Sequence, residues 1–188
     1  MALAGAASAN LLTNPGFETG DLTGWDAAGW YTQTGGDAHS GTWGAGYHVL
    51  SGAPNNDFYV ALQYVPVTAN ASYDFAGWLR FAGLNESESF LEVVFIDNLG
   101  AWGGQYQSVH QTTTEGYTLY SITNMIADGD AVTARVAAVV HTTALTTDQS
   151  WHNVDDMSFD QTIPEPTTLG LLGMAVAGMI VLRRKNRA

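Results

Sequence analysis

The chain has no cysteine among its 188 residues, which excludes both a disulfide and a thiolate metal site. This absence does not place the protein in the cytoplasm, because many exported bacterial domains use no cysteine. The length is sufficient for one domain with a core of ordinary size. Hydrophobic residues make up 46% of the chain and charged residues 13%, a composition typical of a globular protein rather than a disordered one.

Positive charge is nearly missing from the body of the chain. Four of the six basic residues occupy the last six positions: Arg183, Arg184, Lys185 and Arg187. Only Arg80 and Arg135 remain, against 17 carboxylates between Glu18 and Asp160, which leaves a net charge of about −15. Such a domain repels phosphate backbones, so we expect no nucleic-acid partner. Two interpretations stay open: the carboxylates hold a hard cation such as Ca²⁺, or they only keep the protein soluble.

Signatures of catalysis are also missing. The serines lack a nucleophile-elbow context, and no phosphate-binding loop is present. No HExxH or HxH spacing occurs among the five histidines, His39, His48, His110, His141 and His152. Carboxylates are numerous enough for a glycosidase pair, but a sandwich of about 150 residues leaves little chain for the long loops of such a cleft. We expect no enzyme, with a glycoside-active enzyme as a distant alternative.

No helical period precedes the C-terminal tail; short alternating segments are separated by turn residues instead. In the clearest segment Val132, Val136 and Val140 share one face, and Thr133 and Arg135 share the other. Ten strands are predicted: Leu11–Thr13, Trp30–Gln33, Gly44–Leu50, Phe58–Val67, Ser72–Phe81, Phe90–Asp97, Tyr106–Gln111, Tyr117–Ile126, Val132–Val140 and Trp151–Phe159. Together they predict an all-β fold, a two-sheet antiparallel β-sandwich with the jelly roll as its leading form.

The N-terminal residues 1–9 end in the small-x-small pattern Ala7-Ser8-Ala9, which is typical of signal-peptide cleavage, here before Asn10. A basic start and a full apolar stretch are missing. We interpret residues 1–9 as the remnant of a signal peptide with a misplaced start; an unstructured N-terminus is the alternative.

The C-terminal end has three parts in a fixed order. Pro164-Glu165-Pro166 comes first, and its prolines favour an extended segment that a peptidase can reach. An apolar run of 14 residues follows, Leu169 to Leu182, and then the basic cluster, which we expect to stay cytoplasmic. The run is short for a bilayer that needs roughly 20 residues. We nevertheless predict a single transmembrane helix, because a buried core helix would not end in an arginine-rich flank.

This order resembles the PEP-CTERM sorting signal over residues 163 to 187. The resemblance implies that an exosortase, a membrane cysteine peptidase, removes the tail during export from a Gram-negative bacterium. The protein would be anchored in the inner membrane during sorting and would end at the cell surface or in the extracellular matrix. The expected domains are residues 1–9, the body 10–162 and the sorting tail 163–188.

The body has a resemblance of its own. The segment 10–25, with Asn14-Pro15-Gly16-Phe17-Glu18, resembles the opening of carbohydrate-binding-module-like, galactose-binding-like jelly rolls. Three later pieces follow in the family's order: 38–41, 73–80 and 154–159. The resemblance covers about residues 10 to 160 and implies a structural calcium ion where the first and last strands meet, with Glu18 and Asp155 at matching positions.

Alternation along the last strand places Asp155 on the face of Met157 and Phe159, toward the core, where a carboxylate needs a partner or a cation. Asp156 would then point to solvent. Carbonyls near Asp37 and residues 40–42 could complete a calcium shell. The alternative is that Glu18 only caps a turn.

Alternation also predicts a face that binds glycans. Trp78 and Arg80 should point outward from the strand 72–81, and Tyr59 and Gln63 from the strand 58–67. Aromatic rings stack on sugars and polar groups bond hydroxyls, so these four residues are the candidates. Two hypotheses follow: the body binds an extracellular polysaccharide, or it is a structural protein of the surface or biofilm matrix with no small ligand. In the second case a loop would cover Trp78.

Overall fold

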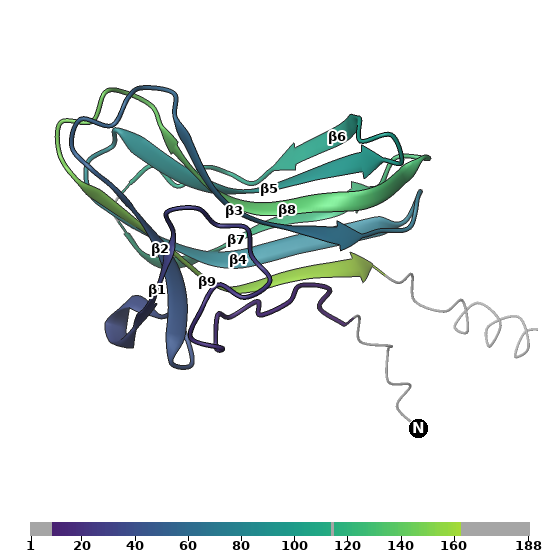
Figure 1. Cartoon of the computed structure of the whole chain (residues 1–188), viewed down its shortest axis with the longest axis horizontal. Coiled ribbons are helices and arrows are strands. Elements are labelled where there is room, and N and C mark those ends of the chain that lie inside the picture. The colour runs from purple at the N-terminus through teal and green to yellow at the C-terminus, as the bar shows by residue number, and fades with distance from the viewer. Residues whose placement is uncertain (1–8, 114, 163–188) are drawn as a thin grey trace, which may run out of the picture. The chain divides into compact units, whose positions relative to one another are not determined.

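The computed structural model describes residues 9–113 and 115–162, which lie in one compact unit, Ser8–Thr162. Two antiparallel sheets pack face to face, as predicted, with the four-stranded sheet as the upper layer in Figure 1. The five-stranded sheet has the order β1 (Tyr31–Thr34), β2 (Trp43–Val49), β9 (Ser150–Thr162), β4 (Ser72–Ala82) and β7 (Glu115–Ile126). The four-stranded sheet has the order β3 (Phe58–Pro66), β8 (Ala131–Thr142), β5 (Ser87–Asp97) and β6 (Trp102–Gln107). A short 3-10 turn, η1 (Gly35–Asp37), links β1 to β2.

The core lies between the sheets and confirms the alternation predicted for two strands. On β4, Tyr73, Phe75, Leu79 and Phe81 are buried. On β8, Ala134, Val136, Ala138 and Val140 face them across the sandwich, but Val132, predicted for the same face, is 46% exposed, next to a shift in the register with β5. These strands were predictable because one face of each is consistently apolar, whereas polar residues such as Asp74 and Arg135 interrupt the other.

Strand β3 is turned the opposite way from the prediction. Gln63 is buried on the inner face beside the core, whereas Phe58 and Tyr64 are 51% and 61% exposed. The Gln63 amide donates to the Thr13 carbonyl at 2.7 Å and accepts from the Thr13 amide at 3.0 Å. Alternation misled here because both faces of β3 carry apolar residues: Val60 and Leu62 pack in a second, smaller cluster on the outer face.

A β-bulge in β9 reverses the predicted orientation of Asp155. Asp156 has a φ of +46°, and the register shifts so that Ser158 lies opposite Ala76 while Asp155 lies opposite Trp78. Met157 and Phe159 therefore face the core, and Asp155 faces the outer side of the five-stranded sheet. It is nevertheless fully buried, beneath the loop at residues 39–40.

The predicted strand Leu11–Thr13 is a loop. Leu11 donates one backbone hydrogen bond to Phe159, and the Asn10 side chain makes the next two contacts with β9, through Met157 O and Phe159 N. Strand β6 begins at Trp102 rather than at Tyr106. The prediction missed its first residues because Gly103 and Gly104 have a low strand propensity. No helix within the described residues is long and apolar enough to cross a membrane. The predicted signal remnant and the transmembrane helix lie outside the described residues.

Candidate functional site

The structure does not bring the four predicted glycan-binding residues together. Gln63 is buried on the inner side of β3, and Tyr59, also turned inward, stacks on Tyr47 with ring centroids 4.4 Å apart. Its hydroxyl donates to Asp57 Oδ2 at 3.0 Å, and burial together with this carboxylate raises the pKa of Tyr59 to about 12. Trp78 does face outward, but the His39 ring stacks on it at 3.9 Å, so a loop covers it.

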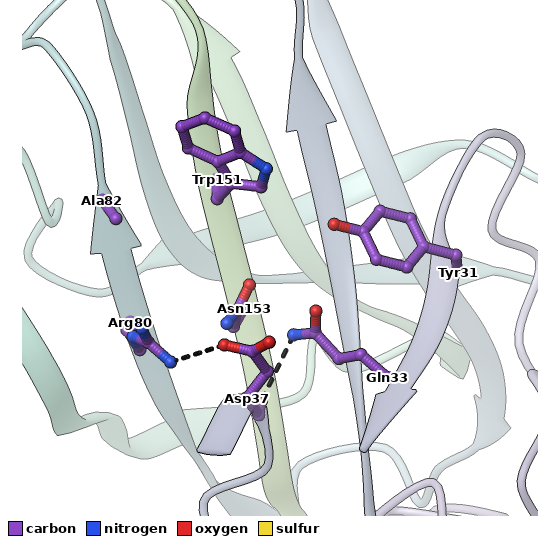
Figure 2. Close-up of a pocket in the computed structure, with 7 residues that line it drawn as sticks. All are labelled: Tyr31, Gln33, Asp37, Arg80, Ala82, Trp151 and Asn153. Atoms are coloured by element: carbon purple, nitrogen blue, oxygen red, sulfur yellow. Dashed lines mark hydrogen bonds and ion pairs between the residues drawn. The ribbon is translucent and has the colours of Figure 1, made fainter. Parts of the chain in front are cut away.

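Arg80 borders an open hollow on the outer face of the five-stranded sheet (Figure 2), and Tyr59 borders a different one, beside Tyr47. Its Nη1 donates to Gly36 O and to Asp37 Oδ1, both at 2.9 Å. These bonds hold η1 against β4 and form one side of the hollow.

Glu18 and Asp155 both lie near Gly16, as does Asp156, whose Oδ1 would be 3.4 Å from a Cβ built there. A Cβ built on Gly16 would be 3.8 Å from Glu18 Cγ and 3.7 Å from Asp155 Oδ1. Glu18 accepts the backbone N–H groups of Thr42 and Trp43, and Asp155 accepts those of His39 and Ser40. Burial raises the pKa of Asp155 despite these hydrogen bonds. The residues that the structure describes hold no cluster of three or more His, Cys, Asp or Glu suited to a metal.

The outer face of the four-stranded sheet, which we call the four-strand face, carries a network that the sequence analysis missed. Arg135 of β8 donates to Glu92 Oε1 of β5 at 2.6 Å. Gln105 and Gln107 of β6 donate to the other oxygen of Glu92, at 2.6 and 2.8 Å. The Arg135 and Glu92 side chains are only 12% and 9% exposed, so the network is fixed before any ligand arrives.

Exposed aromatic rings stand around this network. The Trp102 ring lies over the Arg135 guanidinium, 5.4 Å from it, and is 62% exposed. Tyr64 lies directly across the sheet register from Arg135. Farther along β8, the buried side chains Ala137 and Val139 are small; in the sheet register they lie between Leu62 and Glu92 and between Val60 and Phe90. In Figure 1 the sheet is concave along its strands on this side.

A second polar cluster continues the same face. Glu88 Oε1 lies 3.0 Å from His110 Nδ1 and 2.9 Å from His141 Nδ1. The His110 ring stacks on Phe90 at 4.0 Å, and the His141 ring stacks on Phe58 at 4.2 Å. The face thus offers aromatic surface and hydrogen-bonding groups together, the combination that holds a polyhydroxy ligand.

The sequence held a signal for this face. Glu92 interrupts the apolar run of β5, and Arg135 is one of two cations in the body. Charges on buried strands need partners, and here the two are partners of each other. Their pairing was hidden because it depends on the order of the strands.

Comparison with known proteins identifies the C-terminal end. Residues 162–185 match the family model described as the PEP-CTERM protein-sorting motif. The chain carries a PEP-CTERM sorting signal. The motif begins at the last residue of β9, and such a signal implies export with processing by an exosortase. No curated protein matches the chain in sequence.

The body of this PEP-CTERM protein is similar in fold to solved carbohydrate-binding modules. TmCBM61, solved with β-1,4-galactotriose, is 21% identical with a TM-score of 0.61; the match covers 82% of this chain and all of that one. The CBM22-1 xylan-binding domain of Paenibacillus barcinonensis Xyn10C is 16% identical with a TM-score of 0.54, over 86% of this chain and 99% of that one. An arabinose-bound α-L-arabinofuranosidase is 16% identical with a TM-score of 0.61, but only 27% of that enzyme is covered. These likenesses confirm the β-sandwich jelly roll.

Proposed function

We propose that the body is a non-catalytic carbohydrate-binding module that attaches an exported PEP-CTERM protein to a neutral extracellular polysaccharide. The four-strand face is the binding surface. An exosortase is the processing partner, and the inner membrane holds the protein until its tail is removed.

The observation that carries this proposal is the set of Trp102, Arg135 and Glu92. A buried ion pair is weak as a source of stability, because apolar residues of similar volume serve as well. On the outer face of a sheet, such a pair is better explained by ligand binding. The ion pair packs against one face of the Trp102 ring and fixes the ring above the sheet. The opposite face of the ring does not contact the pair, so a sugar ring can stack on it. Galactotriose and xylan, the ligands named for two structural neighbours, indicate the class of neutral glycan to try first.

The test is a glycan-array screen followed by calorimetry on the purified full-length chain. We expect Trp102→Ala to weaken binding roughly tenfold or more, because it removes a central aromatic contact. Folding should be unaffected, since the side chain is mostly exposed. The matched control is Leu119→Ala, which removes an exposed side chain from the opposite sheet. Unchanged affinity in Trp102→Ala would remove the four-strand face from the proposal, and a folded protein that binds no glycan would favour the structural surface protein.

We also propose that a structural calcium ion sits between Glu18 and Asp155. The support is their approach around Gly16 and the burial of the Asp155 carboxylate, whose charged form a cation would stabilise. With only two carboxylates, backbone carbonyls would have to complete the shell. The ion would fasten the N-terminal loop and the 39–43 loop to β9.

Calcium should therefore raise the melting temperature, and EDTA should lower it. A free concentration about 100 times Kd stabilises the folded state by about 2.7 kcal/mol. Glu18→Gln should abolish the calcium response, whereas Asp148→Asn, at an exposed position, should keep it. A melting temperature that is the same in calcium and in EDTA would exclude the ion.

A further inference from the structure

The hollow beside Arg80 has the size and lining of a second binding site. Its volume is about 510 Å³, within the range of ligand pockets. It lies on the outer face of the five-stranded sheet, the side opposite to the four-strand face. Its lining comes from β1, η1, β4 and β9: Tyr31, Gln33, Asp37, Arg80, Ala82, Trp151 and Asn153.

The floor of this pocket holds an unsatisfied polar group. Asn153 is only 6% exposed, and its Oδ1 has no hydrogen-bond partner among the described residues. A buried amide oxygen without a partner is costly unless a ligand or water supplies the donor. In Figure 2 Asn153 lies beside the Asp37 carboxylate, between Arg80 and Gln33. A hydroxyl donor in the pocket would satisfy it once the amide turns its oxygen toward the pocket.

A glycine lies under the floor of the pocket. In the sheet register Gly46 lies between Tyr31 and Asn153. A Cβ at this position would come within 3.1 Å of Gln33 Nε2 and 3.2 Å of Asn153 Oδ1. Gly46 does not have a positive φ, so the backbone does not require glycine here. A glycine inside a strand often marks a close approach, and here the missing side chain lets the Gln33 and Asn153 amides lie close to the sheet in the floor of the pocket.

Two aromatic side chains border the same space. Trp151 is 42% exposed and Tyr31 is 38% exposed. The Trp151 ring is backed by His48, stacked at 4.7 Å, and His48 Nε2 lies 3.1 Å from Gln149 Oε1. Figure 2 shows the Tyr31 hydroxyl pointing toward the middle of the pocket. The Trp151 ring is therefore held for stacking before a ligand binds.

The charges of the pocket select a neutral ligand. Its lining contains one cation, Arg80, and one carboxylate, Asp37, and these are paired at 2.9 Å. An anion would have to compete with Asp37, and a cation with Arg80. What remains is aromatic surface and amide groups, which suit a polyhydroxy compound of no net charge.

We infer that this pocket is a second saccharide-binding site, so that one molecule holds two polysaccharide chains. The inference that the ligand is a saccharide rests on the proposed function; the existence of the pocket does not. Because the two sites lie on opposite outer faces of the sandwich, one glycan segment does not reach both without wrapping around the body. The protein is then a cross-linker of matrix polysaccharide rather than a simple anchor.

The experiment is calorimetry on the full-length chain with β-1,4-galactotriose and xylohexaose as probes, together with light scattering in long galactan or xylan. The variants are Trp102→Ala for the four-strand face, Trp151→Ala and Gln33→Ala for the pocket, the double variant Trp102→Ala/Trp151→Ala, and Leu119→Ala as control. Gln33→Ala is included in case Trp151→Ala does not fold. Because Gln33 belongs to the short edge strand β1, replacing it should leave the fold intact.

We expect two saccharides per wild-type chain, one in either single tryptophan variant and none in the double variant. Scattering should rise with the wild type and the control, but with neither single variant. One site in the wild type that Trp151→Ala and Gln33→Ala leave intact would overturn the pocket and keep the proposed function. One site that only the pocket variants remove would keep the pocket and overturn the four-strand face. No binding of either probe or polymer would overturn both.

Discussion

His152 is a buried group with no role in the proposed sites. Its ring is 1% exposed and stacks on Phe81 at 4.6 Å, and its Nε2 lies 2.9 Å from Ser87 Oγ. Burial lowers the pKa of His152 to about 3 from the usual 6.5. The folded protein therefore keeps this histidine neutral over the whole range in which the unfolded chain protonates it.

The consequence is a loss of stability in mild acid. Below pH 6.5 the unfolded state binds a proton that the folded state does not, so the free energy of unfolding falls as pH falls toward 3, by up to about 1.4 kcal/mol per pH unit from this group. Urea denaturation at pH 7, 6 and 5 measures the slope. His152→Gln should flatten it, and Leu119→Ala, which replaces an exposed side chain that does not ionise, should not. Equal slopes in the wild type and His152→Gln would show that His152 protonates within the fold.

At the scale of elements, the loop before β2 depends on one glycine. Gly41 has a φ of +62°, and a Cβ there would collide with Glu18 Oε1, the oxygen that accepts the Thr42 and Trp43 amides. Gly52 has a φ of +85°, but no described atom lies within 4 Å of the position of its Cβ. The two glycines share the backbone strain and differ only in the contact.

Gly52→Ala should lower the free energy of unfolding by about 1 kcal/mol, the cost of a left-handed backbone for alanine. Gly41→Ala should cost about 1–3 kcal/mol more, because it also displaces the carboxylate from two backbone donors. Thermal and urea denaturation of both variants give the difference. If the two losses are the same, Glu18 contributes nothing to holding this loop.

The strands also show how much of the fold could be predicted from the sequence. Strands β4 and β8 were predictable because each has one consistently apolar face. Strand β3 was not, since Val60 and Leu62 belong to a second cluster on the outer face. The bulge at Asp156 left no periodic signal, and it moved Asp155 to the other side of its strand.

The candidate site depended even more on strand order. Arg80 and Trp78 were placed on the correct face of β4, but His39 covers Trp78. Arg135 and Glu92 are 43 residues apart and meet only because β8 pairs with β5. A single sequence with no sheet order gives no reason to put them together.

For the whole molecule, net charge decides between classes of glycan. A body of about −15 repels polymers that carry uronic acids, and both sites pair their single arginine with a carboxylate. We expect neutral polysaccharides to bind with nearly the same affinity at about 50 and 500 mM NaCl, because little charge is involved. Uronate-bearing polymers should bind poorly at the lower salt and better at the higher. Tighter binding of the acidic polymer at low salt would mean that a local cationic surface outweighs the net charge.

β9, the last strand of the body to be synthesised, is the central strand of the five-stranded sheet. β9 pairs with β2 on one side and with β4 on the other, and it ends where the sorting motif begins. A chain that crosses a membrane from its N-terminus therefore cannot close this sheet until nearly all of the body has been delivered. β2 and β4 must wait with open edges, exposed to other chains, for the segment that joins them. The five-stranded sheet is therefore completed only when β9 pairs with both of these edges, at the end of the body's passage across the membrane.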